Sequence, residues 1–130
     1  MKKCLVWIIV LTLLFNLCVI LTREGESTSG QFDEFEVITI NGDEEFNELA
    51  SSENWSGDGS ISNPWVIEGY QIDAKGKRYG IKISNTTNHF VIKNCYLHNT
   101  SGGYNEEDFG IYMFNVENGL VTNNTLSNTD

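Results

Sequence analysis

The sequence is poor in basic residues, cysteine and proline, and each shortage excludes a class of protein. Eight Lys and Arg stand against eighteen Asp and Glu, for a net charge of −10. A nucleic-acid-binding surface needs clustered cations, so we expect no nucleic-acid partner. Of three Cys, Cys4 and Cys18 lie in an N-terminal apolar run, which leaves Cys95 alone and excludes a disulfide framework. A single Pro beside twelve Gly fits a chain with many turns, and the aromatic and β-branched content is too high for disorder.

Charge is also missing from residues 4–21, which follow two lysines at the start of the chain. A basic start and an apolar core are typical of an export signal, and this run is long enough to span hydrocarbon. We expect residues 1–22 to be a signal peptide or a transmembrane anchor, with the rest of the chain exported to the cell surface or the extracellular space. Both forms stay open, because no Ala-x-Ala cleavage site follows the run. Residues 23–35 are polar and acidic, and predict an exposed linker.

Four Asn-x-Ser/Thr sequons follow the apolar run, at Asn54, Asn85, Asn99 and Asn123. In an exported chain each of them is a candidate glycan acceptor. A chain rich in Asn and Thr also produces such sequons by chance, so the motif alone does not assign a modification.

The body of the chain repeats itself. The stretch "YGIKISNTTNHFVIKN" at Tyr79 returns as "FGIYMFNVENGLVTNN" at Phe109, and "WVIEGYQID" at Trp65 matches "FVIKNCYLH" at Phe90. Repeats of 20–50 residues are the signature of solenoids, propellers and arrays. Three residue columns follow from the alignment: Ile67, Ile92 and Val121; Gly69, Asn94 and Asn123; Ile72, Leu97 and Leu126.

The content of each repeat predicts stacked strands. Short apolar pieces at about 79–84, 90–93 and 95–98 are separated by Asn or Gly, and no ten-residue helix fits between them. Stacked copies would pair these strands in parallel, with Ile81 beside Ile111. The Gly and Asn column would supply left-handed bends, which those residues tolerate best, and stacked Asn side chains would hydrogen-bond along it.

An N-terminal cap is expected before the repeats. The stretch "FEVITI" at 35–40 alternates like a strand, and residues 43–52 have helical spacing with acids in the first turn. The whole stretch from "ITINGDEEFNELASS" to "HNT" at residue 100 resembles the right-handed parallel β-helix repeat family of NosD-like microbial and archaeal surface proteins. That resemblance implies an all-β, right-handed parallel β-helix over residues 36–130, with a cap at 36–64 and about 2.5 coils at 65–130. The last coil is expected to be truncated and to pair with further coils or another chain.

The family implies several functions, and we expect a surface scaffold or binding module for glycans or protein partners. The alternatives are a polysaccharide lyase or glycoside hydrolase, and a NosD-like accessory protein for metal delivery. The repeat positions carry Asp73, Lys82 and Lys93 without acids stacked in register, and Glu68 has Lys93 and Thr122 as its copies, so we predict no catalytic residues. Strand alternation places Cys95 inward and His98 outward, which argues against a shared metal and makes Cys95 a core residue.

The insertion "SGGYNEED" at 101–108 lengthens one coil relative to "AKGKR" at 74–78. It predicts a recognition loop, and its acids are a candidate Ca²⁺ site at Glu106, Glu107 and Asp108; otherwise no cofactor is expected. The alternative is simple charge pairing with Lys77 and Arg78 in the neighbouring loop, worth about 0–1 kcal/mol for each exposed pair. The candidate binding residues are Tyr79, Tyr104, Glu106, Glu107, Asp108 and Tyr112.

Overall fold

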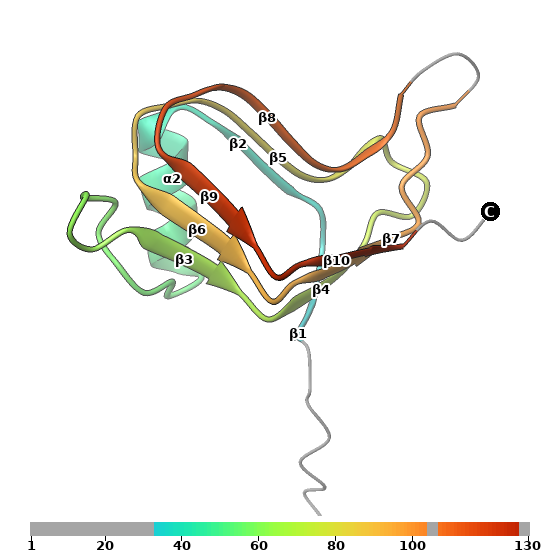
Figure 1. The fold of residues 1–130 in the computed structure, drawn as a ribbon, viewed down its shortest axis with the longest axis horizontal. Coiled ribbons are helices and arrows are strands. Elements are labelled where there is room, and N and C mark those ends of the chain that lie inside the picture. Colours follow the sequence, from blue (N-terminus) through green and yellow to red (C-terminus); the bar gives the residue numbers. More distant parts are fainter. Residues whose placement is uncertain (1–32, 104–106, 128–130) are drawn as a thin grey trace, which may run out of the picture. The chain divides into compact units, whose positions relative to one another are not determined.

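The computed structural model describes residues 33–103 and 107–127, which form mostly strands with one short helix (Figure 1). The predicted all-β class is therefore confirmed. The elements are β1 (Asp33–Phe35), β2 (Ile38–Asn41), α2 (Asp43–Ser52), β3 (Trp65–Glu68), β4 (Tyr70–Asp73), β5 (Tyr79–Thr86), β6 (Phe90–Lys93), β7 (Tyr96–His98), β8 (Phe109–Val116), β9 (Gly119–Thr122) and β10 (Thr125–Ser127).

The strands pair in parallel into three sheets, with orders β1-β4-β7-β10, β2-β5-β8 and β3-β6-β9. Each successive layer of chain adds one strand to every sheet. We call β2, β3 and β4 the first layer, β5, β6 and β7 the second, and β8, β9 and β10 the third. Figure 1 shows the three sheets enclosing a common interior, with strands of like position lying side by side.

The register of these sheets is the one that the repeat predicts. Ile81 pairs with Ile111 in β5 and β8, and Leu97 pairs with Leu126 in β7 and β10. Ile92 lies between Ile67 and Val121 in the third sheet. Because a shift of one residue would turn every apolar side chain to the opposite face, the aliphatic columns determine this register.

The bends between strands use left-handed backbone, as the Gly and Asn column predicts. Gly69, Asn94 and Asn123 have φ of 76°, 54° and 52°. A second asparagine ladder runs along β2, β5 and β8, where Asn115 Nδ2 donates to Asn85 Oδ1 at 2.9 Å and Asn85 Nδ2 donates to Asn41 Oδ1 at 2.7 Å. The asparagine bends of the second and third layers are thus tied to the layer below by side-chain hydrogen bonds.

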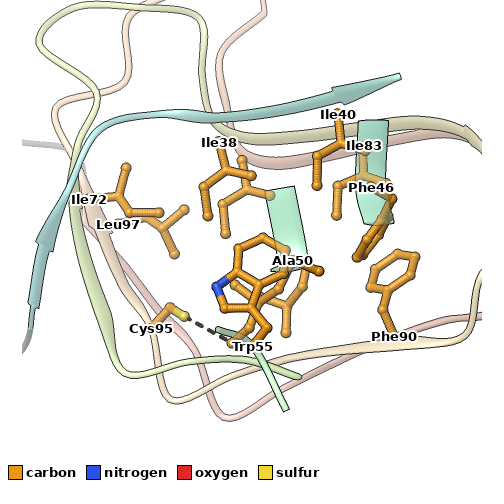
Figure 2. Packing of buried hydrophobic residues seen from close by; sticks show 13 residues of the cluster. Ile38, Ile40, Phe46, Ala50, Trp55, Ile72, Ile83, Phe90, Cys95 and Leu97 are labelled. Atoms are coloured by element: carbon orange, nitrogen blue, oxygen red, sulfur yellow. Dashed lines mark hydrogen bonds between the residues drawn. The ribbon is translucent and has the colours of Figure 1, made fainter. Parts of the chain in front are cut away.

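The core is a column of aliphatic side chains closed at one end by α2. Ile40, Ile83, Ile72 and Leu97 point into the same interior from different sheets (Figure 2). Each such buried side chain stabilises the fold by roughly 1.5–3 kcal/mol through removal of apolar surface from water. The helix contributes its buried Phe46, whose ring centroid lies 5.2 Å from that of Phe90.

The predicted cap helix at 43–52 coincides with α2. The strand predicted at 35–40 overlaps β2 over residues 38–40. The linker predicted at 23–35 forms a strand at its C-terminal end. Asp33–Phe35 is strand β1 and pairs in parallel with β4, because Phe35 packs on Tyr70 with ring centroids 4.8 Å apart. A single apolar residue between acids gives no alternating pattern, so the sequence did not reveal a strand there.

The apolar run at 4–21 lies outside the described residues, so its signal or anchor role stays a prediction. Within residues 33–103 and 107–127 no helix is long and apolar enough to cross a membrane.

Candidate functional site

Three aromatic rings gather on the outer face of the β2-β5-β8 sheet, opposite its aliphatic side. Parallel pairing sets Tyr79 of β5 beside Phe109 of β8, with ring centroids 6.1 Å apart and planes within 17°. Tyr112 completes the group, at 4.9 Å from Tyr79 and 5.5 Å from Phe109. We call these three residues the aromatic cluster. Its members come from two layers, so the cluster exists only when the layers stack in register.

Two cations lie over the aromatic cluster. The Arg78 guanidinium carbon and the Lys82 ammonium nitrogen are each 5.5 Å from the Tyr79 ring centroid. Such cation–π contacts contribute about 0.5–1 kcal/mol at exposed sites and fix the ring and the cation together. The result is an aromatic surface with two basic side chains on a strongly acidic chain.

A groove of about 400 Å³ adjoins the aromatic cluster. Its aromatic residues come from β8, and its hydroxyl, amide and ammonium groups come from β2 and β5. The arrangement combines an apolar surface for stacking with hydrogen-bonding groups that fix orientation, as ligand sites do. Its lining residues are Thr39, Asn41, Lys82, Ser84, Asn85, Tyr112 and Phe114.

A larger depression of about 530 Å³ lies over the bend between β6 and β7 and is lined by Gln71, Asn94, Cys95, Tyr96, Asn123 and Thr125. It offers one aromatic ring, Tyr96, which already stacks on His98 with centroids 5.1 Å apart. We favour the face with the aromatic cluster, because three clustered rings beside polar groups offer more stacking surface to a ligand than a hollow with one ring.

The structure brings together only some of the predicted binding residues. Tyr79 and Tyr112 lie in the aromatic cluster, whereas Tyr104 and Glu106 lie outside the described residues. Glu107 and Asp108 are exposed. Arg78 Nε donates to the backbone carbonyl of Glu107 at 2.9 Å, so the two stacked loops do meet, through a main-chain oxygen.

Calcium at this loop stays a prediction, since one of its three proposed ligands is not described. Among the residues that the structure does describe, no group of three His, Cys, Asp or Glu side chains could hold a metal ion.

The four sequons differ in what their side chains do. The amide nitrogens of Asn85, Asn99 and Asn123 donate to Asn41, Asp73 and Asn94 respectively, one layer below. Asn54 is exposed on the loop after α2 with φ 55°. Glycosylation stays a prediction at all four, but three of these asparagines have a structural role that a glycan on the amide would disrupt.

Cys95 is a core residue, as strand alternation predicts. It is 2% exposed, and its Sγ lies 3.4 Å from the carbonyl oxygen of Lys93. Burial raises the pKa of the Cys95 thiol above its ordinary value, which disfavours the thiolate that would attack a substrate or bind a metal.

Sequence reasoning missed a column of Asp73, His98 and Ser127, which pair across β4, β7 and β10. The column lies one residue beyond Ile72, Leu97 and Leu126, so the same alignment could have found it. Asp73 Oδ1 accepts from the Lys75 N–H at 2.9 Å, and this bond, followed by that from Asn99, lowers the pKa of Asp73. The carboxylate therefore serves the bend, and the column alone does not make a catalytic site.

Sequence reasoning also missed four members of the candidate binding face: Phe109, Phe114, Arg78 and Lys82. The offset of the repeat does place the two phenylalanines beside Tyr79 and Ser84.

Comparisons with protein-family models, curated proteins and solved structures found no match for this chain. The function must therefore be inferred from the residues and their geometry.

Proposed function

We propose that this chain is an exported, cell-surface binding module built as a right-handed parallel β-helix, and that it binds glycans on the β2-β5-β8 face. The sheet orders, the in-register aliphatic columns and the Asn bends support the β-helix. The basic and apolar N-terminus supports export. A C-terminal reporter active only outside the cytoplasm tests export, and activity of a cytoplasmic reporter alone would refute it.

The aromatic cluster beside the groove is the observation that carries glycan binding. A sugar ring has an apolar C–H face, which packs on an aromatic ring, and a rim of hydroxyl groups, which need hydrogen-bond partners. Tyr112 supplies a ring at the groove wall, and Lys82 and Asn85 supply donors within the same lining. Because these groups stand on paired strands, the face is organised before a ligand arrives, which lowers the entropic cost of binding.

Binding is favoured over cleavage because the described residues that line the groove include no carboxyl group. Hydrolysis of a glycosidic bond commonly uses two carboxyl groups that face the same sugar. The charged side chain within the lining is Lys82, whose ammonium lies over Tyr79. This arrangement suits recognition of hydroxyl or acidic groups on a sugar.

The test is titration calorimetry of the full chain against a panel of oligosaccharides, neutral and acidic. Tyr79→Ala and Tyr112→Ala should each weaken binding about tenfold or more, which corresponds to about 1.4 kcal/mol. Tyr96→Ala is the matched control, because Tyr96 is a half-buried tyrosine on the sheet that contains β7. The proposal fails if no sugar binds, or if Tyr96→Ala weakens binding as much as the cluster variants.

A further inference from the structure

Lys82 is the middle member of a row of three side chains across the β2-β5-β8 sheet. It pairs with Thr39 of β2 on one side and with Tyr112 of β8 on the other, and all three line the groove. Figure 1 shows β5 between those two strands. Lys82 therefore lies within the sheet, with a paired strand on each side of it.

The positive charge of Lys82 is available to a ligand. Its ammonium nitrogen lies 5.5 Å from the Tyr79 ring centroid, a contact that orients the side chain without neutralising it. Among the described residues Lys82 has no ion-pair or hydrogen-bond partner. Lys93 of β6 differs, because its ammonium lies 3.1 Å from a carboxylate oxygen of Glu68. The charge of Lys93 is thus paired within the chain, and that of Lys82 is not.

Other polar groups of the groove are largely used within the sheet. Asn85 Nδ2 donates to Asn41 Oδ1 at 2.7 Å, and the Ser84 hydroxyl donates to the carbonyl oxygen of Ile40 at 3.2 Å. The ammonium of Lys82 carries three N–H donors and no acceptor. Because hydrogen bonds between charged groups are stronger than neutral ones, Lys82 favours an anionic acceptor on the ligand.

The negative charge of the whole chain does not prevent an anion from binding in the groove. The net charge is −10, but at physiological ionic strength exposed charges are screened beyond about 8 Å. Glu45 contacts the lining through the main chain of Asn41, whose N–H donates to Glu45 Oε2 at 2.7 Å. The charged side chain within the described lining itself is Lys82.

We propose that this face selects glycans whose sugar rings carry an anionic group, a carboxylate or a sulfate ester, and that Lys82 determines the selectivity. The inference rests on the proposed glycan binding and adds the class of sugar. Tyr112 and Lys82 are direct partners on adjacent strands, which are about 4.8 Å apart. A sugar stacked on the Tyr112 ring therefore presents a substituent on its rim to the ammonium. As a compact point charge, the ammonium accepts either anion.

Titration calorimetry of the full chain with three matched tetrasaccharides tests the proposal. The probes are cellotetraose, its form oxidised at C6 to glucuronate, and its form sulfated at C6, so that they differ at C6 alone. At least one acidic form should bind about five- to tenfold more tightly than cellotetraose, and the two acidic forms together identify the anion. A preference below about twofold for both acidic forms would overturn the proposal.

Two lysine variants distinguish the local charge from the charge of the whole chain. Lys82→Met keeps an unbranched side chain without the charge and should abolish the preference for the acidic form, whereas Lys82→Arg should retain it. Lys93→Met is the matched control, because it removes the same charge from a different sheet and should leave the preference intact. Circular dichroism would show that each variant is folded. A preference that survives Lys82→Met, or that falls equally in Lys93→Met, would overturn the proposal.

The same titrations separate this inference from the glycan binding on which it rests. Binding of cellotetraose that is weakened by Tyr112→Ala, without any preference for the acidic forms, would refute the selectivity alone. Absence of binding by all three tetrasaccharides would refute the selectivity and the proposed binding together.

Discussion

Replacement of Asp43 by Asn should destabilise the fold in a pH-dependent way. Asp43 begins α2, and its carboxylate joins the helix to the chain that follows β5 in the second layer. Oδ1 accepts from Thr86 Oγ1 at 2.5 Å and from the Thr87 N–H at 2.8 Å, and Oδ2 accepts from Thr87 Oγ1 at 2.8 Å. These bonds, that from the Thr86 hydroxyl above all, lower the pKa of Asp43 from 3.8 to about 2.

The size of the effect follows from this pKa. At ~1.36 kcal/mol for each pKa unit, the drop corresponds to a ceiling of about 2.4 kcal/mol. Asp43 is partly exposed, and solvent screening reduces the contribution to roughly 1–2 kcal/mol. In a domain of this size, each kcal/mol of lost stability lowers the melting temperature by about 4–8 °C.

The sign of the pH dependence follows from the direction of the shift. Because the folded pKa of Asp43 lies below the unfolded one, its contribution is fully present above about pH 4 and is lost as the pH falls through about 2. Urea unfolding at pH 7 should therefore separate the wild type from Asp43→Asn by about 1–2 kcal/mol, and most of the difference should be lost by about pH 2.

Glu44→Gln is the control, because Glu44 is an exposed acid in the same first turn of α2. Like Asp43→Asn, this variant removes one negative charge near the N-terminus of α2. It breaks no hydrogen bond to the second layer. Equal destabilisation by the two variants would mean that the dipole, and not the contact with Thr86, stabilises the helix. A difference that stays constant from pH 7 to pH 2 would also refute the reasoning.

Three further predictions concern the bends and the core. Gly57→Ala should lower the free energy of unfolding by more than ~2 kcal/mol in urea, since its Cβ would lie 2.1 Å from the Pro64 carbonyl oxygen at φ 113°. The control is Gly76→Ala, which lies in open space at φ 76° and should lower it by only about 1 kcal/mol. Equal losses in the two variants would contradict the clash. Asn85→Gly keeps the left-handed bend and loses two ladder bonds, so it should cost about 1–2 kcal/mol, and an unchanged stability would show that the ladder is unimportant. Asn85→Val should cost more because it also strains the backbone at φ 54°, and a smaller cost than that of Asn85→Gly would refute the strain. Cys95 should resist iodoacetamide in the folded chain and react after unfolding, as peptide mass would show, whereas rapid labelling of native protein would place it at the surface.

The layer register could be predicted from the sequence because it depends on side-chain columns. Ile81 beside Ile111 and Leu97 beside Leu126 follow from alignment of the repeat, and the structure confirms both pairs. Strand β1 could not be predicted, because its pairing is provided by β4, far along the chain. The sequence contained no local signal for it beyond Phe35.

The candidate binding face was predicted only in part. Tyr79 and Tyr112 were identified from the sequence. Lys82 contributes because its ammonium lies over the Tyr79 ring, and the spacing of residues in the sequence does not show that position. The groove depends on Lys82 and Asn85 of the second layer lying beside Tyr112 and Phe114 of the third. Such a site combines side chains across layers, so its shape appears only when the strands are stacked.

The corner between β7 and β8 has an evolutionary consequence. Residues 99–108 connect those strands, whereas residues 74–78 connect β4 and β5, yet Tyr79 still pairs with Phe109. Insertions at this corner therefore leave the columns undisturbed, and mutation can lengthen, shorten or recharge the loop without a penalty in the core. Since the loop adjoins Phe109, its length and charge can vary beside the candidate binding face while the columns of the scaffold keep their register.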